Sequence, residues 1–146
     1  MGLAQRRLCC SQPKGQANIV LGARRSAELE TLAGQINHSN GRAVFLSGDV
    51  KDEDYANALV DLAMKEFGRL DGAFNNAGVV GEMGPVADMG LGNWNDVIAV
   101  NLTSAFLAAK AQIPVMKKRG QGSIVFTSQR RLRRQPFSYF PTGRPS

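Results

Sequence analysis

The chain has only two cysteines among its 146 residues, and they are adjacent, at Cys9 and Cys10. Adjacent cysteines cannot build a disulfide framework, so a secreted disulfide scaffold is excluded and a reducing compartment is expected. The longest uninterrupted apolar stretches run for about five residues, far short of the ~20 that span a bilayer. Residues 1–13 also lack the apolar run of a secretory signal. We therefore expect a cytoplasmic protein without a membrane partner.

Acidic residues are absent from both ends of the sequence. Residues 1–17 hold three basic residues and no acid, and residues 129–146 hold five arginines and no acid. Residues 18–128 carry ten basic residues and all twelve acids, so the net charge of +6 comes from the ends. The arginines of the tail suggest nucleic-acid binding, but the tail has no regularly interleaved aromatic residues and the middle is slightly acidic. The sequence therefore disfavours a nucleic-acid partner.

The middle of the chain alternates strands with helices, whereas neither end shows apolar periodicity. Short apolar runs predict strands at 18–23, 43–47, 70–74 and 123–127. Apolar residues at helical spacing predict helices over about 26–36, 52–67 and 94–113. Strands that are apolar throughout, alternating with helices, are typical of a parallel α/β sheet covered on both faces. We expect one domain over 18–128, flanked by a basic head (1–17) and an Arg/Pro-rich tail (129–146).

Three residues are expected to mark the ends of these helices. Ser26 is a good N-cap for the first helix, because its hydroxyl can accept a free backbone N–H. Gly68 is suited to stop the second helix. Pro114 has no N–H to donate, so we expect it to end or bend the third.

Ligands of open parallel sheets bind at the carboxyl ends of the strands. The residues that follow the four predicted strands are therefore the candidates for a site. They are Arg24, Asp49, residues 75–78 and Ser128.

An ordered set of short motifs carries a family resemblance. Asn-Asn-Ala-Gly stands at 75–78 after a strand, Gly-Asp-Val stands at 48–50, and Asn101 lies within the long helix. Over about residues 15–128 this set closely resembles the short-chain dehydrogenase/reductases. The resemblance implies a partial Rossmann-type doubly wound parallel sheet and a nicotinamide dinucleotide cofactor. It also implies hydride transfer to or from a small-molecule carbonyl or alcohol, no metal, and compatibility with a homo-oligomer.

The resemblance assigns cofactor contacts at the ends of the second and third predicted strands. Asp49 would accept a hydrogen bond from the adenine amino group, with Val50 beside the ring; the alternative for Asp49 is a turn or helix-cap acid. Asn76, Ala77 and Gly78 would line the cofactor. Gly78 is expected to let the backbone turn and approach the cofactor where a Cβ would clash.

Arg24 bears on the choice of cofactor. Ala23 occupies the strand-end position where family members that prefer NAD carry an acid. A guanidinium just after that position can pair with a 2′-phosphate through two charge-assisted hydrogen bonds. NADP is therefore favoured over NAD. The alternative is a solvated surface arginine.

Asn101 is the candidate catalytic residue. It falls within the predicted inner stripe of the long helix, together with Trp94, Val97, Ile98, Leu102 and Ala105. An amide in an apolar stripe must find hydrogen-bond partners. In the family this asparagine holds a water of the proton relay; the alternative is a structural asparagine bonded to a neighbouring backbone.

Several parts of the family pattern have no match in this sequence. Of the glycine-rich diphosphate loop only Gly2 remains, and Gln129 stands where the family has its catalytic serine. Tyr139 is followed four positions later by Gly143 instead of lysine. The family's first strand would lie between those at 18–23 and 70–74. Without it, we expect two strand pairs with exposed apolar edges.

Three hypotheses remain open from the sequence. The first is an NADP-dependent short-chain reductase by descent, incomplete and inactive as this chain. The second is a catalytically silent remnant that binds a cofactor or partner and folds by dimerising or by accepting a strand. The third is nucleic-acid binding through the tail. Because composition changes where the resemblance stops, near 17 and near 128, we expect both ends to be reading-frame artefacts or products of a disrupted gene, joined to a genuine reductase core.

Overall fold

The computed structural model describes residues 17–128. Its elements, in chain order, are β1 (Asn18–Ala23), α1 (Ser26–His38), β2 (Arg42–Ser47), α2 (Glu53–Phe67), β3 (Gly72–Asn75), η1 (Val86–Asp88), α3 (Leu91–Ile98), the π-helical turn η2 (Ala99–Thr103), α4 (Ser104–Lys118) and β4 (Ser123–Phe126). Strand and helix alternate as predicted. The α/β class is therefore confirmed.

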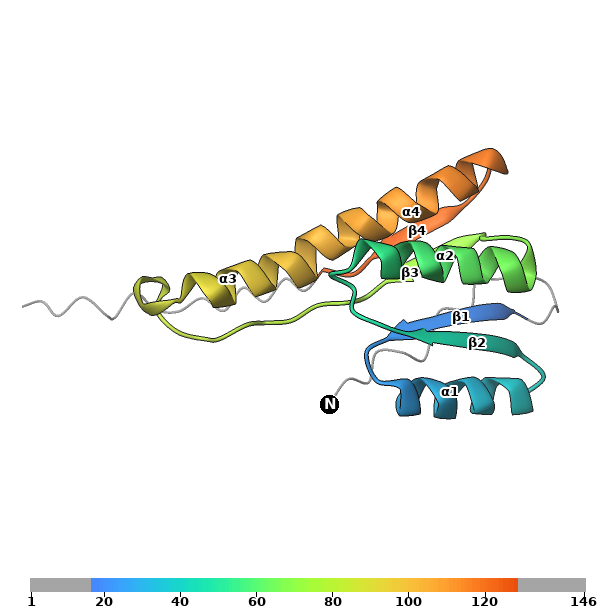
Figure 1. The fold of residues 1–146 in the computed structure, drawn as a ribbon, viewed down its shortest axis with the longest axis horizontal. Coiled ribbons are helices and arrows are strands. Elements are labelled where there is room, and N and C mark those ends of the chain that lie inside the picture. Colours follow the sequence, from blue (N-terminus) through green and yellow to red (C-terminus); the bar gives the residue numbers. More distant parts are fainter. Residues whose placement is uncertain (1–16, 129–146) are drawn as a thin grey trace, which may run out of the picture.

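The four strands form two separate parallel pairs in the described part of the chain. β1 pairs with β2, and β3 pairs with β4, but β1 and β3 do not pair with each other. Figure 1 shows α1 on one side of the β1–β2 pair and α2 on the other. The expected split into two pairs is therefore confirmed for residues 17–128.

Helix α2 begins and ends as its sequence predicts. The Asp52 carboxylate caps its start by accepting the N–H of Asp54 at 3.0 Å. Gly68 ends it in the left-handed conformation (φ 67°) and donates its N–H to the carbonyl of Met64. Tyr55, Val60 and Ala63 are buried.

Helix α1 corrects one expected cap. Ser26 is the first residue of the helix instead of its N-cap, and Arg25 takes the cap position without a side-chain cap bond. The Arg25 guanidinium pairs with Glu28 in the first turn, and the Arg25 carbonyl accepts the N–H of Leu29. The helix therefore starts one residue earlier than the serine pattern suggests. Its predicted apolar stripe is confirmed at Leu29 and Ala33, which are buried.

Helix α3, the turn η2 and α4 follow one another without a break from Leu91 to Lys118. Pro114 lies inside α4, so the first of its two predicted effects, ending the helix, is wrong. Proline forfeits one hydrogen bond, to the carbonyl of Lys110, but the last turn is held because Met116 is buried. By length and composition alone, this helix could cross a membrane, which the short apolar runs of the sequence did not predict. Core helices of soluble proteins meet the same criterion of length and composition.

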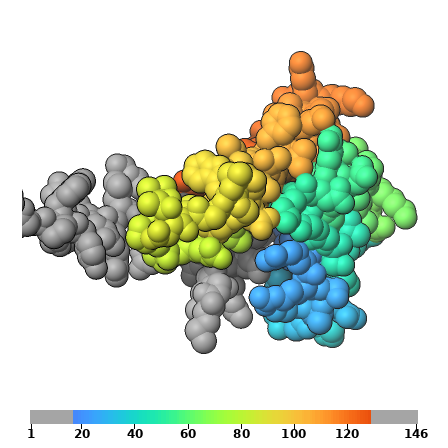
Figure 2. Space-filling view, turned by 60° about the vertical axis from the view of Figure 1, so that its left-hand side comes forward, coloured from blue at the N-terminus to red at the C-terminus, as the bar shows by residue number. Residues whose placement is uncertain are grey.

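Helix α2 connects the two parts of the molecule. It packs on β1 and on α4, while α4 also packs on β3. An ion pair between Lys110 Nζ and Glu53 Oε1, at 2.7 Å, joins α4 to the start of α2. In Figure 2 the α1–β1–β2 part (blue) and α4 (orange) lie on opposite sides of α2 (green). The helix layer is thus continuous although the sheet is not.

Candidate cofactor-binding site

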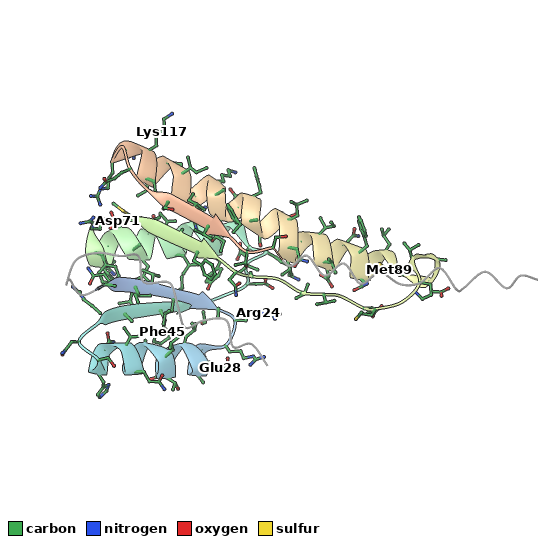
Figure 3. The ribbon with its side chains drawn as sticks, turned by 180° about the vertical axis from the view of Figure 1, so that it is seen from behind. Arg24, Glu28, Phe45, Asp71, Met89 and Lys117 are labelled. Carbon is green, nitrogen blue, oxygen red and sulfur yellow. The ribbon has the colours of Figure 1, made fainter. Side chains whose placement is uncertain are left out.

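The carboxyl ends of the strands face the same side of the molecule. Each strand pair is parallel, and Figure 3 shows β1 and β3 pointing the same way, with Arg24 at the end of β1. The residues predicted from the ends of β1, β2 and β3 therefore lie along one edge. They are Arg24, Asp49, Val50, Asn76, Ala77 and Gly78. Asn101 reaches the last of these segments from the long helix.

Asp49 takes part in the turn that follows β2, in agreement with its alternative role as a turn acid. Its Oδ1 accepts the N–H of Lys51 at 3.0 Å, and its carbonyl accepts the N–H of Asp52. Its Oδ2 lies 3.9 Å from Lys51 Nζ, and its side chain is 42% exposed. The carboxylate therefore has free capacity to accept another donor, and the half-buried Val50 follows it.

Arg24 and Arg25 differ in their surroundings. Arg25 is held by Glu28. Arg24 is exposed, and no side chain within residues 17–128 accepts a hydrogen bond or ion pair from it. Of the two guanidinium groups at the end of β1, that of Arg24 is therefore the one without a described partner.

Asn101 lies at the centre of the π-helical turn η2 and is bonded to a neighbouring backbone. Its Oδ1 accepts the N–H of Val79 and its Nδ2 donates to the carbonyl of Val79, both at 2.8 Å. π-Turns are rare and frequently occur at functional sites. The pairing matches the alternative weighed from the sequence, a structural asparagine, and it fixes the loop that follows Gly78.

The expected burial of the Asn101 stripe is found only in part: Val97, Ile98 and Ala105 are half-buried. Trp94 is 53% exposed, Leu102 is 63% exposed, and Asn101 is exposed as well. Figure 1 shows α3 extending past the ends of the strands, so no described strand lies beneath its apolar side. The partner of Asn101 is a loop, not a packed core.

Sequence patterns did not predict the other side chains that hold this edge. Asn75 and Gln112 exchange two amide hydrogen bonds of 3.0 Å, which tie the end of β3 to α4. Thr127 Oγ1 donates to Asn76 Oδ1 at 2.7 Å, which joins the ends of β3 and β4. Their spacings of 37 and 51 residues leave no local signal, although amides on an otherwise apolar face are one clue.

Asn93 is a second asparagine of the long helix that binds the same loop. Its Oδ1 accepts the N–H of Glu82 at 3.0 Å, next to Gly81, which has a φ of 74°. A Cβ at Gly81 would come within 2.5 Å of Val97. Only glycine fits this turn, because both the positive φ and the contact exclude a side chain.

The reason expected for Gly78 is corrected in part. Its φ is not positive, and a Cβ there would approach Asn101 Oδ1 only to 3.5 Å, an ordinary contact. Neither the turn nor the protein's own packing therefore requires glycine. The close approach of a cofactor remains a prediction for this position.

The surface hollows lie elsewhere. A shallow hollow of about 440 Å³ runs between α1 and β2, lined by Glu30, Asn37, Phe45 and their neighbours. None of the predicted site residues lines it. The residues at the strand ends fit the adenine half of a dinucleotide, whereas residues 17–128 contain no glycine-rich loop for its diphosphate.

Comparison with known proteins identifies a family and individual relatives. The profile of the family described as short chain dehydrogenase matches residues 6–135. A 2,5-dichloro-2,5-cyclohexadiene-1,4-diol dehydrogenase of Sphingobium indicum is 37% identical over 105 residues, which is 70% of this chain and 42% of that protein. Levodione reductase of Leifsonia aquatica is 35% identical over 80 residues, 55% of this chain and 30% of the relative.

Solved structures agree with this result. A 3-ketoacyl-ACP reductase from Sinorhizobium meliloti superposes with a TM-score of 0.69 at 36% identity, over 73% of this chain and 43% of that one. A 7 alpha-hydroxysteroid dehydrogenase complexed with NADH and 7-oxo glycochenodeoxycholic acid gives a TM-score of 0.70 at 27% identity, over 75% and 42%. The chain thus spans less than half the length of these relatives.

Proposed function

Because this chain belongs to the short-chain dehydrogenase family, we propose that residues 18–128 are the adenine-binding part of an NADP-dependent reductase. The observation that carries the proposal is the shared edge formed by Arg24, Asp49 and residues 75–78. The family uses a nicotinamide dinucleotide, which supplies or accepts a hydride when bound. The substrate class is a small-molecule carbonyl or alcohol, and the setting is the cytoplasm.

Two residues account for the adenosine end of the cofactor. Asp49 keeps an acceptor for the adenine amino group, because Lys51 uses only one of its oxygens in a hydrogen bond. Arg24 supplies a free guanidinium for a 2′-phosphate, because it has no described partner while Arg25 is paired with Glu28. NAD, which lacks that phosphate, would lose this contact.

Binding of cofactor fragments tests this assignment on the 146-residue chain. Adenosine 2′,5′-bisphosphate should bind more tightly than AMP in titration calorimetry. One bidentate charge-assisted contact is worth about 1.5–3 kcal/mol, or roughly 10- to 150-fold. Arg24→Ala should abolish this preference, and the matched variant Arg25→Ala should retain it. An unchanged preference in Arg24→Ala contradicts the assignment.

Asn101 is the candidate catalytic residue of the intact family member. Its carboxamide uses one lone pair of Oδ1 and one hydrogen of Nδ2 in bonds to Val79. One acceptor position and one donor hydrogen remain on the side chain. These are sufficient to hold a water of a proton relay beside the loop at 78–82.

The 146-residue chain is proposed to lack reductase activity by itself. Tyr139 has no lysine four residues later, and no lysine occurs after Lys118. A positioned general acid contributes about 10²–10⁴ to a rate. Without a tyrosine whose pKa a lysine lowers, Asn101 has no proton donor to serve.

A catalytically silent binding protein is the second candidate. The division of the sheet into two strand pairs favours it, because the edges of β1 and β3 are open to a partner within the described residues. A homo-oligomer is compatible with this candidate.

A further inference from the structure

Lys51 follows the candidate adenine ligand Asp49 by two residues and contacts both oxygens of its carboxylate. Its backbone N–H donates to Asp49 Oδ1 at 3.0 Å. Its ammonium lies 3.9 Å from Asp49 Oδ2, which is an ion-pair distance but too long for a hydrogen bond. Oδ2 is therefore the oxygen that is open to another donor, and a cation lies beside it.

Asp96 of α3 binds the same ammonium. Its Oδ1 accepts a long hydrogen bond of 3.5 Å from Lys51 Nζ, although 45 positions separate the two residues in the sequence. Within residues 17–128, this is the only hydrogen bond or ion pair between α3 and a residue that precedes β3. The ammonium thus lies between two carboxylates, one after β2 and one on the long helix.

The Lys51 ammonium can compete with an adenine amino group for Asp49 Oδ2. Both groups are N–H donors, and the ammonium is the stronger donor because it is charged. The lysine side chain is flexible and 41% exposed, so a small rotation would bring Nζ within hydrogen-bond distance of Oδ2. An ammonium bonded there would also offset the negative charge that attracts the amino group. Adenine binding at Asp49 therefore requires that another acceptor hold Lys51.

We propose that Asp96 is a positioning residue for the adenine site, because it draws the Lys51 ammonium toward α3 and leaves Asp49 Oδ2 free for the amino group of the base. This inference rests on the proposed assignment of Asp49 to adenine. Asp96 acts through Lys51 and not by direct contact with the base. It lies within a helix, so the motifs at the strand ends do not identify it.

A purely structural role of this ion pair predicts a different result. If the pair only ties the turn after β2 to α3, loss of either partner should disturb adenine binding equally. If Asp96 restrains a competitor, loss of Asp96 weakens adenine binding and loss of Lys51 does not. Comparison of Asp96→Asn with Lys51→Met therefore separates the two roles.

The contribution of the amino group is measured with two nucleotides of equal charge. AMP and purine riboside 5′-monophosphate differ only in that amino group, so the ratio of their dissociation constants reports the contact with Asp49. The ratio also cancels the change in net charge of a variant. In titration calorimetry of the 146-residue chain at low ionic strength, we expect a ratio of about two to ten in favour of AMP. Asp49→Ala should abolish this preference.

Asp96→Asn should lower the preference for AMP by about two- to fivefold, the range of an exposed ion pair. Asp96→Glu keeps the carboxylate and should retain the preference. Lys51→Met, alone or combined with Asp96→Asn, should also retain it, because the competing ammonium is gone. Asp88→Asn is the matched control, since Asp88 is exposed and its side chain makes no hydrogen bond or ion pair with another described residue.

Each contrary result has a distinct meaning. Equal losses in Asp96→Asn and Lys51→Met overturn the proposal in favour of a structural tie, and an unchanged preference in Asp96→Asn shows that Lys51 does not compete. If the unmodified chain shows no preference for AMP, the assignment of Asp49 to adenine fails as well. Asp96 is 74% exposed, so its substitution should leave the fold intact, which circular dichroism checks. If Lys51→Met is unfolded, the contrast between Asp96→Asn and Asp96→Glu decides the question.

Discussion

Tyr55 links the packing of α2 to the candidate cofactor edge. Its hydroxyl donates to the carbonyl of Leu46 at 2.9 Å. Its ring lies within 2.2 Å of the position of a Cβ at Gly48, the residue before Asp49. Burial raises the pKa of the Tyr55 phenol. One buried ring thus fixes the strand-to-turn junction that presents Asp49.

Tyr55→Phe should cost about 0.5–1.5 kcal/mol in the free energy of unfolding, because the ring stays and only the hydrogen bond is lost. A raised pKa means that the folded state favours the neutral phenol. The free energy of unfolding should therefore fall as pH rises above about 10, the ordinary tyrosine value. Urea titrations across this range check both effects. A decline of equal steepness in Tyr55→Phe contradicts the role of Tyr55.

Gly48→Ala should destabilise the fold by about 1–3 kcal/mol, since the new Cβ overlaps the Tyr55 ring and the backbone must shift. The turn at Asp49 moves with it, so binding of adenosine 2′,5′-bisphosphate should weaken. Gly84→Ala is the matched control, because a Cβ there meets nothing within 4 Å. Denaturation midpoints and calorimetry measure the two effects. Equal stability of the two variants rules out the proposed contact.

Individual contacts were predictable only where they depend on local sequence. Asp49 as a turn acid and Gly68 as a helix stop follow from neighbouring residues. The pairing of Asn75 with Gln112 does not, because 37 residues separate them and either amide could have met water. The sequence predicts that the Asn101 amide needs hydrogen-bond partners, but it does not predict that Val79 supplies them.

At the scale of elements, the long helix holds the loop after β3 through two asparagines. Asn101 binds the backbone of Val79, and Asn93 binds that of Glu82. Asn93 lies in α3, and Asn101 lies at the centre of the π-helical turn η2, which directly precedes α4. The helix and the loop therefore behave as one unit at the carboxyl edge.

Asn101→Ala should release this loop. Two hydrogen bonds to Val79 are lost at an exposed site, so the free energy of unfolding should drop by about 1–2 kcal/mol. The Val79 amide should exchange its hydrogen faster. Asn95→Ala, at a neighbouring exposed position of α3, should leave both quantities unchanged. A Val79 amide that keeps its protection in Asn101→Ala would show that other contacts hold the loop.

Strands were easier to predict than the end of the long helix. The apolar run at 18–23 gives β1 its observed bounds, because a strand of a parallel sheet is apolar throughout. The helix continues past Pro114, where its last turn is held by the buried Met116. The local sequence does not predict this, because the burial of Met116 depends on tertiary packing. The exposed side of α3 was mispredicted for the same reason, because the spacing of its apolar residues does not predict which element packs against them.

At the scale of the whole molecule, the division into two strand pairs was predictable from the family resemblance, and not from the periodicity of apolar residues. Periodicity predicts four strands, and the family's strand order predicts which of them lack a neighbour. Partly exposed apolar side chains such as Phe74 and Val125, at 36% and 41%, accompany this division. Helix α2 keeps the two parts together through β1 and α4.

We propose that this 146-residue chain holds the cofactor-binding part of a short-chain reductase and lacks the general acid that the reaction needs. NADPH oxidation by the purified 146-residue chain, with a panel of aldehydes and ketones, tests it most directly. We expect a rate no higher than that of buffer, and no difference between the chain and Asn101→Ala. NADPH oxidation that rises in proportion to the chain, and disappears in Asn101→Ala, would contradict it.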